Sequence, residues 1–143
     1  MYLNHVPAIT RVMEQVTSSS ADELATLDAL LFPENCFNET TLAREIELGF
    51  CRVEWIHRTI VAYALVRGGE IYDLLRLGVH PEYQGHGLGS DLLHYVQNLG
   101  KPVMLTVKEG NVGALRLYLC NGFKVIGRLQ EGHGWVLRYD RVS

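Results

Sequence analysis

Hydrophobic positions in the first 50 residues recur three or four positions apart in two stretches, 21–32 and 40–48. This spacing places apolar side chains on one face of a helix. The second stretch is expected to bury Leu42, Ile46 and Leu48 on a shared face. A strand is expected before both helices, over residues 9–16. The chain therefore opens with a strand followed by two helices.

From residue 50 the pattern changes to longer apolar runs that are separated by short polar turns. Such runs are typical of strands, and the short turns are typical of hairpins. The runs cover residues 50–56, 59–66 and 71–79, with turns at 57–58 and 67–70. This part of the chain predicts an antiparallel meander of three strands.

Residues 87–100 return to helical spacing, and residues 102–107 form another apolar run. A strand, a helix and a strand in this order require a right-handed crossover, so strands 71–79 and 102–107 are expected to pair in parallel. The helix face expected to point inward consists of Leu88, Leu92, Tyr95, Val96 and Leu99.

The last third of the chain predicts a helix over 111–120 and a hairpin. An asparagine at its start and Gly122 after its end are typical helix boundaries. The hairpin pairs residues 123–129 with 135–141. The order β-α-α-β-β-β-α-β-α-β-β predicts one α/β (α+β) domain over 1–143, with a mixed, mostly antiparallel central sheet flanked by helices.

Composition agrees with one compact domain, because 143 residues that are 48% hydrophobic and 20% charged suffice for a single core. No apolar run approaches the length of a membrane helix, and the first residues lack the pattern of a secretion signal. We therefore expect a cytoplasmic protein without a membrane partner. The three cysteines and six histidines show no metal-ligand spacing, so no metal is expected.

Charge is unevenly distributed along the chain. The formal net charge of −3 disfavours nucleic acid as a partner, because such binding needs an excess of basic residues. Residues 1–70 hold ten acidic and five basic residues, whereas residues 71–143 hold six acidic and eight basic ones. An anionic ligand is therefore favoured by the second half of the chain, and a cationic one by the first.

The segment 80–90 is rich in glycine and joins a predicted strand to a predicted helix. A helix N-terminus offers unpaired N–H groups and the positive end of the helix dipole, which suits a phosphate or diphosphate. Gly85, Gly87 and Gly89 would let the backbone approach such a ligand closely. The segment lacks the lysine of a nucleotide-triphosphate loop, and it follows an antiparallel meander, unlike a dinucleotide-binding motif. A tight turn without a ligand is the alternative.

Two motifs resemble one family. The run Gln84-Gly85-His86-Gly87-Leu88-Gly89 matches the Q/R-x-x-G-x-G/A loop of the GNAT superfamily of N-acetyltransferases. Residues 111–123 resemble the N-x-x-A-x-x-x-Y-x-x-x-G-F segment of that family. The resemblance covers residues 8–141 and is strongest over 71–126. It implies the GNAT fold, whose element order agrees with the order above, and acetyl-CoA as a cosubstrate.

The resemblance also implies how acetyl-CoA is held. In the family, backbone N–H groups of the loop bind the diphosphate, and the pantetheine arm pairs with the end of the preceding strand, where two parallel strands separate. An asparagine side chain also contacts this arm. The cofactor-binding residues that this implies are Leu77, Val79, Gln84, Gly85, His86, Gly87, Leu88, Gly89, Ser90 and Asn111.

For catalysis, the resemblance implies direct attack of an amine on the thioester, without an acyl-enzyme. Tyr118 matches the family's tyrosine beside the thioester sulfur, and its phenol would protonate the leaving thiolate. Asp73 stands where some members carry a glutamate base, while Glu70 or water are the alternatives. Thr106 replaces the glutamate that the N-terminal alanine acetyltransferases carry on the next strand, a departure from that subgroup.

The acceptor expected from the resemblance is a small-molecule amine or a protein or peptide amine. Acidic residues around the second predicted helix are compatible with attracting a cationic amine. A different class of function stays open, a noncatalytic CoA-binding or interaction module with the same fold. The assembly state also stays open, with a homodimer as one option.

Overall fold

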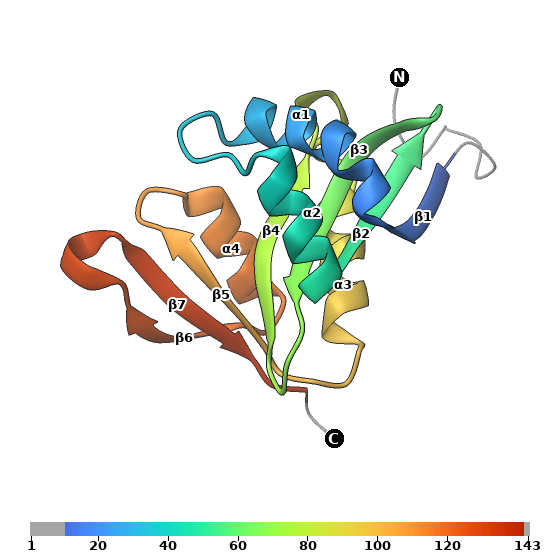
Figure 1. Ribbon diagram of the computed structural model, residues 1–143. Coiled ribbons are helices and arrows are strands. Elements are labelled where there is room, and N and C mark those ends of the chain that lie inside the picture. The colour runs from blue at the N-terminus through green and yellow to red at the C-terminus, as the bar shows by residue number, and fades with distance from the viewer. Residues whose placement is uncertain (1–10, 142–143) are drawn as a thin grey trace.

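The computed structural model describes residues 11–141 and contains one seven-stranded sheet with the strand order β1-β2-β3-β4-β5-β7-β6 (Figure 1). Four α-helices accompany the strands in this described part of the chain. The elements are β1 (Arg11–Val16), α1 (Ala21–Leu31), α2 (Glu39–Leu48), β2 (Gly49–Ile56), β3 (Thr59–Arg67), β4 (Tyr72–Val79), α3 (Leu88–Gln97), β5 (Val103–Lys108), α4 (Val112–Cys120), β6 (Lys124–Arg128) and β7 (Gly134–Tyr139).

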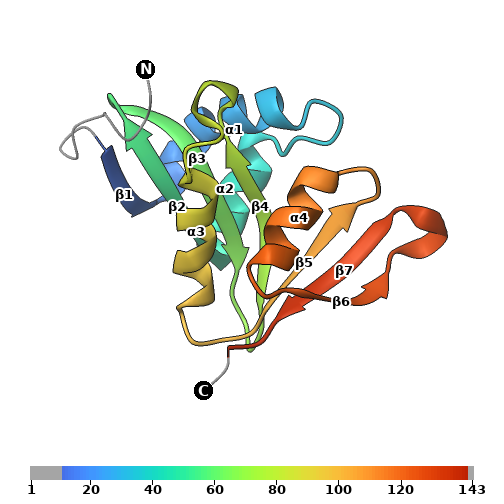
Figure 2. The same ribbon diagram turned by 180° about the vertical axis from the view of Figure 1, so that it is seen from behind.

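The sheet separates two hydrophobic cores. Helices α1 and α2 cover one face, and α3 and α4 cover the other (Figures 1 and 2). Leu24, Leu42 and Tyr63 lie in the first core, and Leu92 and Tyr118 lie in the second. Within residues 11–141, no helix has the length and hydrophobicity needed to cross a membrane.

The predicted order of elements is confirmed over the described residues. β2, β3 and β4 form an antiparallel meander, and β4 pairs with β5 in parallel after the α3 crossover. The β2–β3 turn places His57 and Arg58 at positive φ, 51° and 65°. Such turns match the twist of a two-residue hairpin even though neither residue is glycine. Residues 9 and 10 of the predicted first strand lie outside the described part.

Two predicted helix faces needed correction. Leu48 is 61% exposed, because it lies two positions after Ile46 and a helix turns about 200° over that distance. Glu45 is buried in its place, and its carboxylate accepts from Arg67 Nε at 3.1 Å. In α3, Tyr95 is half-buried and packs against the core as predicted, and Leu93, which was not predicted to point inward, is fully buried. Leu99 is half-buried and lies beyond the end of α3 at Gln97.

An irregularity in β4 opens the centre of the sheet. β3 pairs Leu65 with Arg76 and Val66 with Leu74, which leaves Leu75 as an extra residue on β4. Bulges of this kind bend a strand and increase its twist. β4 and β5 are paired only at Tyr72–Val103 and Asp73–Met104, and beyond these pairs the strands diverge (Figure 1). The opening between them is the centre of the site described next.

Candidate functional site

A cavity of about 230 Å³ occupies the opening between β4 and β5. Phe32 and Asn35, from the connection between α1 and α2, line it on one face of the sheet. Ala114 and Tyr118, from α4, line it on the other face. Helices α1 and α2 lie on the opposite face of the sheet from α4, so the cavity passes through the sheet (Figures 1 and 2). Two molecules that enter from opposite faces would meet inside it.

A second, smaller cavity of about 180 Å³ lies beside the first. Asp73 and Met104 line it, and it shares four residues with the first cavity, namely Leu74, Leu75, Leu105 and Thr106. Asp73 is exposed. The structure therefore places Asp73 in a cavity next to that of Tyr118 and not in the same one. Glu70, the alternative base, is exposed in the turn before β4.

Tyr118 is held by the packing of α4 against the second core. Its ring is 8% exposed and meets Phe123 edge to face, with the ring centroids 5.4 Å apart. Burial raises the pKa of Tyr118 from 10.0 to about 12. The phenol therefore keeps its proton at neutral pH, so it is a hydrogen-bond donor in the wall of the cavity.

The loop between β4 and α3 contains Gly85 and Gly87 and continues into the first turn of α3. We call residues 84–90 the glycine cradle. Gly85 and Gly87 have φ of 81° and 87°, a conformation that glycine adopts without strain. A methyl group added at either position would meet no atom within 4 Å, so open space lies in front of both. Gln84 fixes the loop, because its Nε2 donates to the Val79 carbonyl at 3.0 Å. The cradle fits an anion such as the diphosphate of coenzyme A.

The remaining loop residues take different positions. Leu88 is 1% exposed and points into the core, so it can meet a ligand only through its main chain. Gly89 and Ser90 belong to the first turn of α3, where N–H groups have no partner within the helix. A methyl group at Gly89 would lie 3.5 Å from Val79 Cγ2, in ordinary contact. His86 is half-buried in the loop.

Leu77 and Val79 present their main chains to the opening. The N–H of His80 donates to the Val61 carbonyl on β3 at 2.7 Å. Because successive residues of a strand direct their N–H and C=O groups to opposite sides, those of Val79 and Leu77 point away from β3. The bond from Gln84 to the Val79 carbonyl agrees with this direction. This edge of β4 can therefore pair with an extended ligand.

Asn111 caps α4 and also lines the larger cavity. Its side-chain oxygen accepts from the Ala114 N–H at 3.2 Å, as predicted for a helix cap. The cap uses only the amide oxygen. The Nδ2 hydrogens can therefore donate to a ligand in the cavity.

Sequence reasoning missed two charged residues beside the cavity. Arg76 lines the cavity, and its Nε donates to Asp28, which is fully buried in α1, at 3.1 Å. The signals were present in the sequence. Arg76 interrupts the apolar run of β4, and Asp28 lies four positions after Leu24, on the apolar face of α1. A charged residue at such a place needs a partner when it is buried.

A glycine cradle at a helix N-terminus, next to an opening between two parallel strands, is the arrangement expected of a GNAT acetyltransferase. A family model described as "Acetyltransferase (GNAT) domain" matches residues 38–125. The chain belongs to this family.

Individual relatives agree with the family. The chain is 37% identical over 92 residues to N-alpha-acetyltransferase RimI of Mycobacterium tuberculosis, a match that covers 59% of this chain and 54% of RimI. It is 34% identical over 88 residues to mycothiol acetyltransferase of Thermobifida fusca, covering 56% of this chain and 27% of that protein. The chain thus spans about half the length of the first relative and less of the second.

Among solved structures, Arabidopsis thaliana Naa50 in complex with the bisubstrate analogue CoA-Ac-MVNAL has a similar fold, with a TM-score of 0.79. The similarity covers 92% of this chain and 99% of the Naa50 chain at 21% sequence identity. At this identity the similarity establishes the fold, which is a GNAT fold over nearly the whole chain.

Proposed function

We propose that this protein is an acetyl-CoA-dependent N-acetyltransferase, which transfers an acetyl group to an amine by direct attack. The observation that carries this proposal is the cavity through the sheet, with the protonated Tyr118 in its wall. The names of RimI and mycothiol acetyltransferase support the same class of reaction.

The glycine cradle and the edge of β4 are the proposed cofactor site. N–H groups at residues 85–90 would bind the diphosphate, helped by the positive end of the α3 dipole. The main-chain groups of Leu77 and Val79 would pair with the pantetheine arm along the edge that they present to the opening. Asn111 would donate from Nδ2 to the same arm. Acetyl-CoA supplies the thioester that the amine attacks.

Tyr118 is the proposed general acid. As the amine nitrogen bonds to the acetyl carbon and the carbon–sulfur bond breaks, the phenol donates its proton to the departing thiolate. Asp73 is the proposed base, acting through water, because its cavity shares four lining residues with that of Tyr118. It takes the proton that the amine loses. Tyr118 loses one proton and Asp73 gains one, so the total charge of the enzyme and of the products is unchanged.

A protein or peptide N-terminal amine is the acceptor that we propose first, and a small-molecule amine is the second. RimI is named an N-alpha-acetyltransferase, and the Naa50 analogue joins CoA to the peptide MVNAL. The acceptor would enter past Phe32 and Asn35, on the face opposite α4. Thr106, at the position where the alanine acetyltransferases are expected to have glutamate, lines both cavities, and Asp73 lines the smaller one.

The test measures the free thiol released from acetyl-CoA with a panel of peptides and small amines, with mass spectrometry of the products. We expect one acetyl group to be gained by an amine, and thiol release to fall in Tyr118→Phe. If calorimetry shows that acetyl-CoA does not bind, the proposal is wrong. If acetyl-CoA binds but no amine in the panel releases thiol, the protein is a noncatalytic CoA-binding module instead.

A further inference from the structure

The connection between α1 and α2, residues 32–38, forms part of the cavity wall but has no regular secondary structure. We call it the α1–α2 loop. Phe32 and Asn35 are its contributions to the cavity. Because no ladder of backbone hydrogen bonds holds such a segment, its position depends on contacts with other elements. In this structure Arg76 of β4 makes three of those contacts.

Arg76 contacts the α1–α2 loop at three residues. Its guanidinium carbon lies over the rings of Phe32 and Phe37, 4.3 and 4.2 Å from their centroids. Its Nη2 donates to the Asn35 carbonyl at 2.5 Å. The guanidinium therefore contacts the loop through two aromatic rings and one carbonyl.

Asp28 completes the arrangement from α1. Its Oδ1 accepts from Arg76 Nε at 3.1 Å and from the Tyr63 hydroxyl, and its Oδ2 accepts from the Phe37 N–H at 2.7 Å. The carboxylate is fully buried, and a buried ion pair persists only when its remaining hydrogen-bonding positions are satisfied. Asp28 thus anchors both Arg76 and the far end of the loop.

We infer that Arg76 is a positioning residue, which holds the α1–α2 loop as the wall past which the acceptor amine enters. The inference rests on the proposed function, because it assigns that face of the cavity to the acceptor. Arg76 does not bind the acceptor by its charge, since Asp28 neutralises that charge and the guanidinium already contacts two rings and one carbonyl of the loop. Lysine cannot replace it, because an ammonium group lacks the planar faces and the forked donors that reach three partners.

The test is Arg76→Lys, which keeps the positive charge beside Asp28. We expect hydrogen exchange of the amides in the α1–α2 loop, that of Phe37 above all, to rise about tenfold or more as local opening becomes easier. The KM for the acceptor is expected to rise by about tenfold, while kcat and the dissociation constant for acetyl-CoA change by less than about twofold. A general loss of structure would instead alter all of these quantities together.

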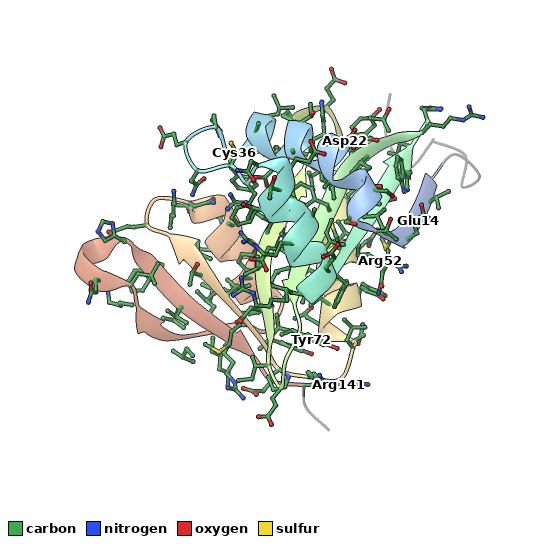
Figure 3. The ribbon with its side chains drawn as sticks, in the orientation of Figure 1. Glu14, Asp22, Cys36, Arg52, Tyr72 and Arg141 are labelled. Carbon is green, nitrogen blue, oxygen red and sulfur yellow. The ribbon has the colours of Figure 1, made fainter. Side chains whose placement is uncertain are left out.

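Arg52→Lys is the matched control. Arg52 of β2 also lies over an aromatic ring, that of Tyr95, at 4.1 Å from the centroid. Figure 3 shows Arg52 well apart from Cys36, which belongs to the α1–α2 loop. This substitution removes a similar arginine–aromatic contact, and we expect it to leave both the exchange of the loop and the KM for the acceptor unchanged.

If Arg76→Lys fails to fold, Asp28→Asn tests the same inference with a side chain of nearly the same shape, and the same pattern of changes is expected. Unchanged exchange in the α1–α2 loop would overturn the inference, as would a mobile loop with an unchanged KM. If the wild-type protein acetylates no amine, the proposed function fails. The exchange measurement would then still decide whether Arg76 holds the loop.

Discussion

At the scale of single residues, the proton of Tyr118 is the most direct target for experiment. Tyr118→Phe keeps the ring and its contact with Phe123 but removes the proposed proton donor. We expect kcat to fall by about 100-fold or more, as for loss of a general acid, while the affinity for acetyl-CoA is retained. Steady-state kinetics together with calorimetry measure both quantities.

The pH profile gives an independent check of the same residue. Because burial raises the pKa of Tyr118 to about 12, the phenol stays protonated well above pH 10, and deprotonation of this group should not lower kcat up to that pH. A decline of the wild-type rate with a midpoint near 10 that disappears in Tyr118→Phe would contradict the raised pKa of Tyr118, although it would still support Tyr118 as the acid.

The backbone at Gly87 gives a second prediction at this scale. Gly87→Ala places a methyl group at φ 87°, so we expect the free energy of unfolding to fall by about 1 kcal/mol. The methyl group would also enter the open space proposed for the diphosphate, so binding of acetyl-CoA should weaken. Urea unfolding and calorimetry measure the two effects.

Gly113→Ala is the control for Gly87→Ala. Gly113 lies inside α4, and an added methyl group there meets no atom within 4 Å. We expect this change to raise the free energy of unfolding by about 0.5–1 kcal/mol, because alanine restricts the unfolded chain and favours a helix. Equal effects at the two positions would show that the positive φ of Gly87 has no importance.

At the scale of elements, two helices begin with the same kind of cap. Asn111 of α4 accepts from Ala114, and Asn38 of α2 accepts from the Thr41 N–H at 2.8 Å. Replacing either asparagine by alanine should lower the free energy of unfolding by about 1 kcal/mol through loss of the cap. Only Asn111→Ala should also weaken acetyl-CoA binding, since only Asn111 lines the cavity. Equal affinities for acetyl-CoA in the two variants would mean that Asn111 serves only as a helix cap.

Which elements the sequence could predict depends on how local their causes are. The helices and strands follow from apolar spacing, and the caps and Gly122 follow from backbone chemistry within a few residues. The burial of Glu45 in place of Leu48 depends instead on Arg67, which lies on another element. The extra residue Leu75 in β4 depends on the register with β3, for which the sequence has no local signal.

The same distinction applies to the site. The glycine cradle is local, so a short motif was enough to find it. The pairing of Asp28 with Arg76 joins residues 48 positions apart, and the sequence around each of them indicates that a partner is needed but not which residue it is. The position of Asp73 in a neighbouring cavity also depended on how β4 and β5 diverge. These features became visible only when the sheet was assembled.

At the scale of the whole molecule, ionisable groups are buried in both cores. Cys51 is fully buried in the core under α1 and α2, and Tyr118 lies in the core under α3 and α4. Burial raises the pKa of the Cys51 thiol from 9.0 to about 12. Burial also raises the pKa of Tyr63, helped by its hydrogen bond to Asp28. Both faces of the sheet thus have buried groups whose pKa is raised, namely Cys51 and Tyr63 on one face and Tyr118 on the other.

These groups predict a loss of stability in alkali. Above pH 9 the unfolded chain loses the Cys51 proton while the native protein keeps it up to about pH 12, so the unfolded state binds fewer protons and the free energy of unfolding falls as pH rises. Cys51 should account for about 1–2 kcal/mol of this fall between pH 8 and 10. Urea unfolding at the two pH values measures it, and Cys51→Ala should show a correspondingly smaller fall. An identical fall in the variant would mean that the thiol ionises as easily inside the core as in the unfolded chain.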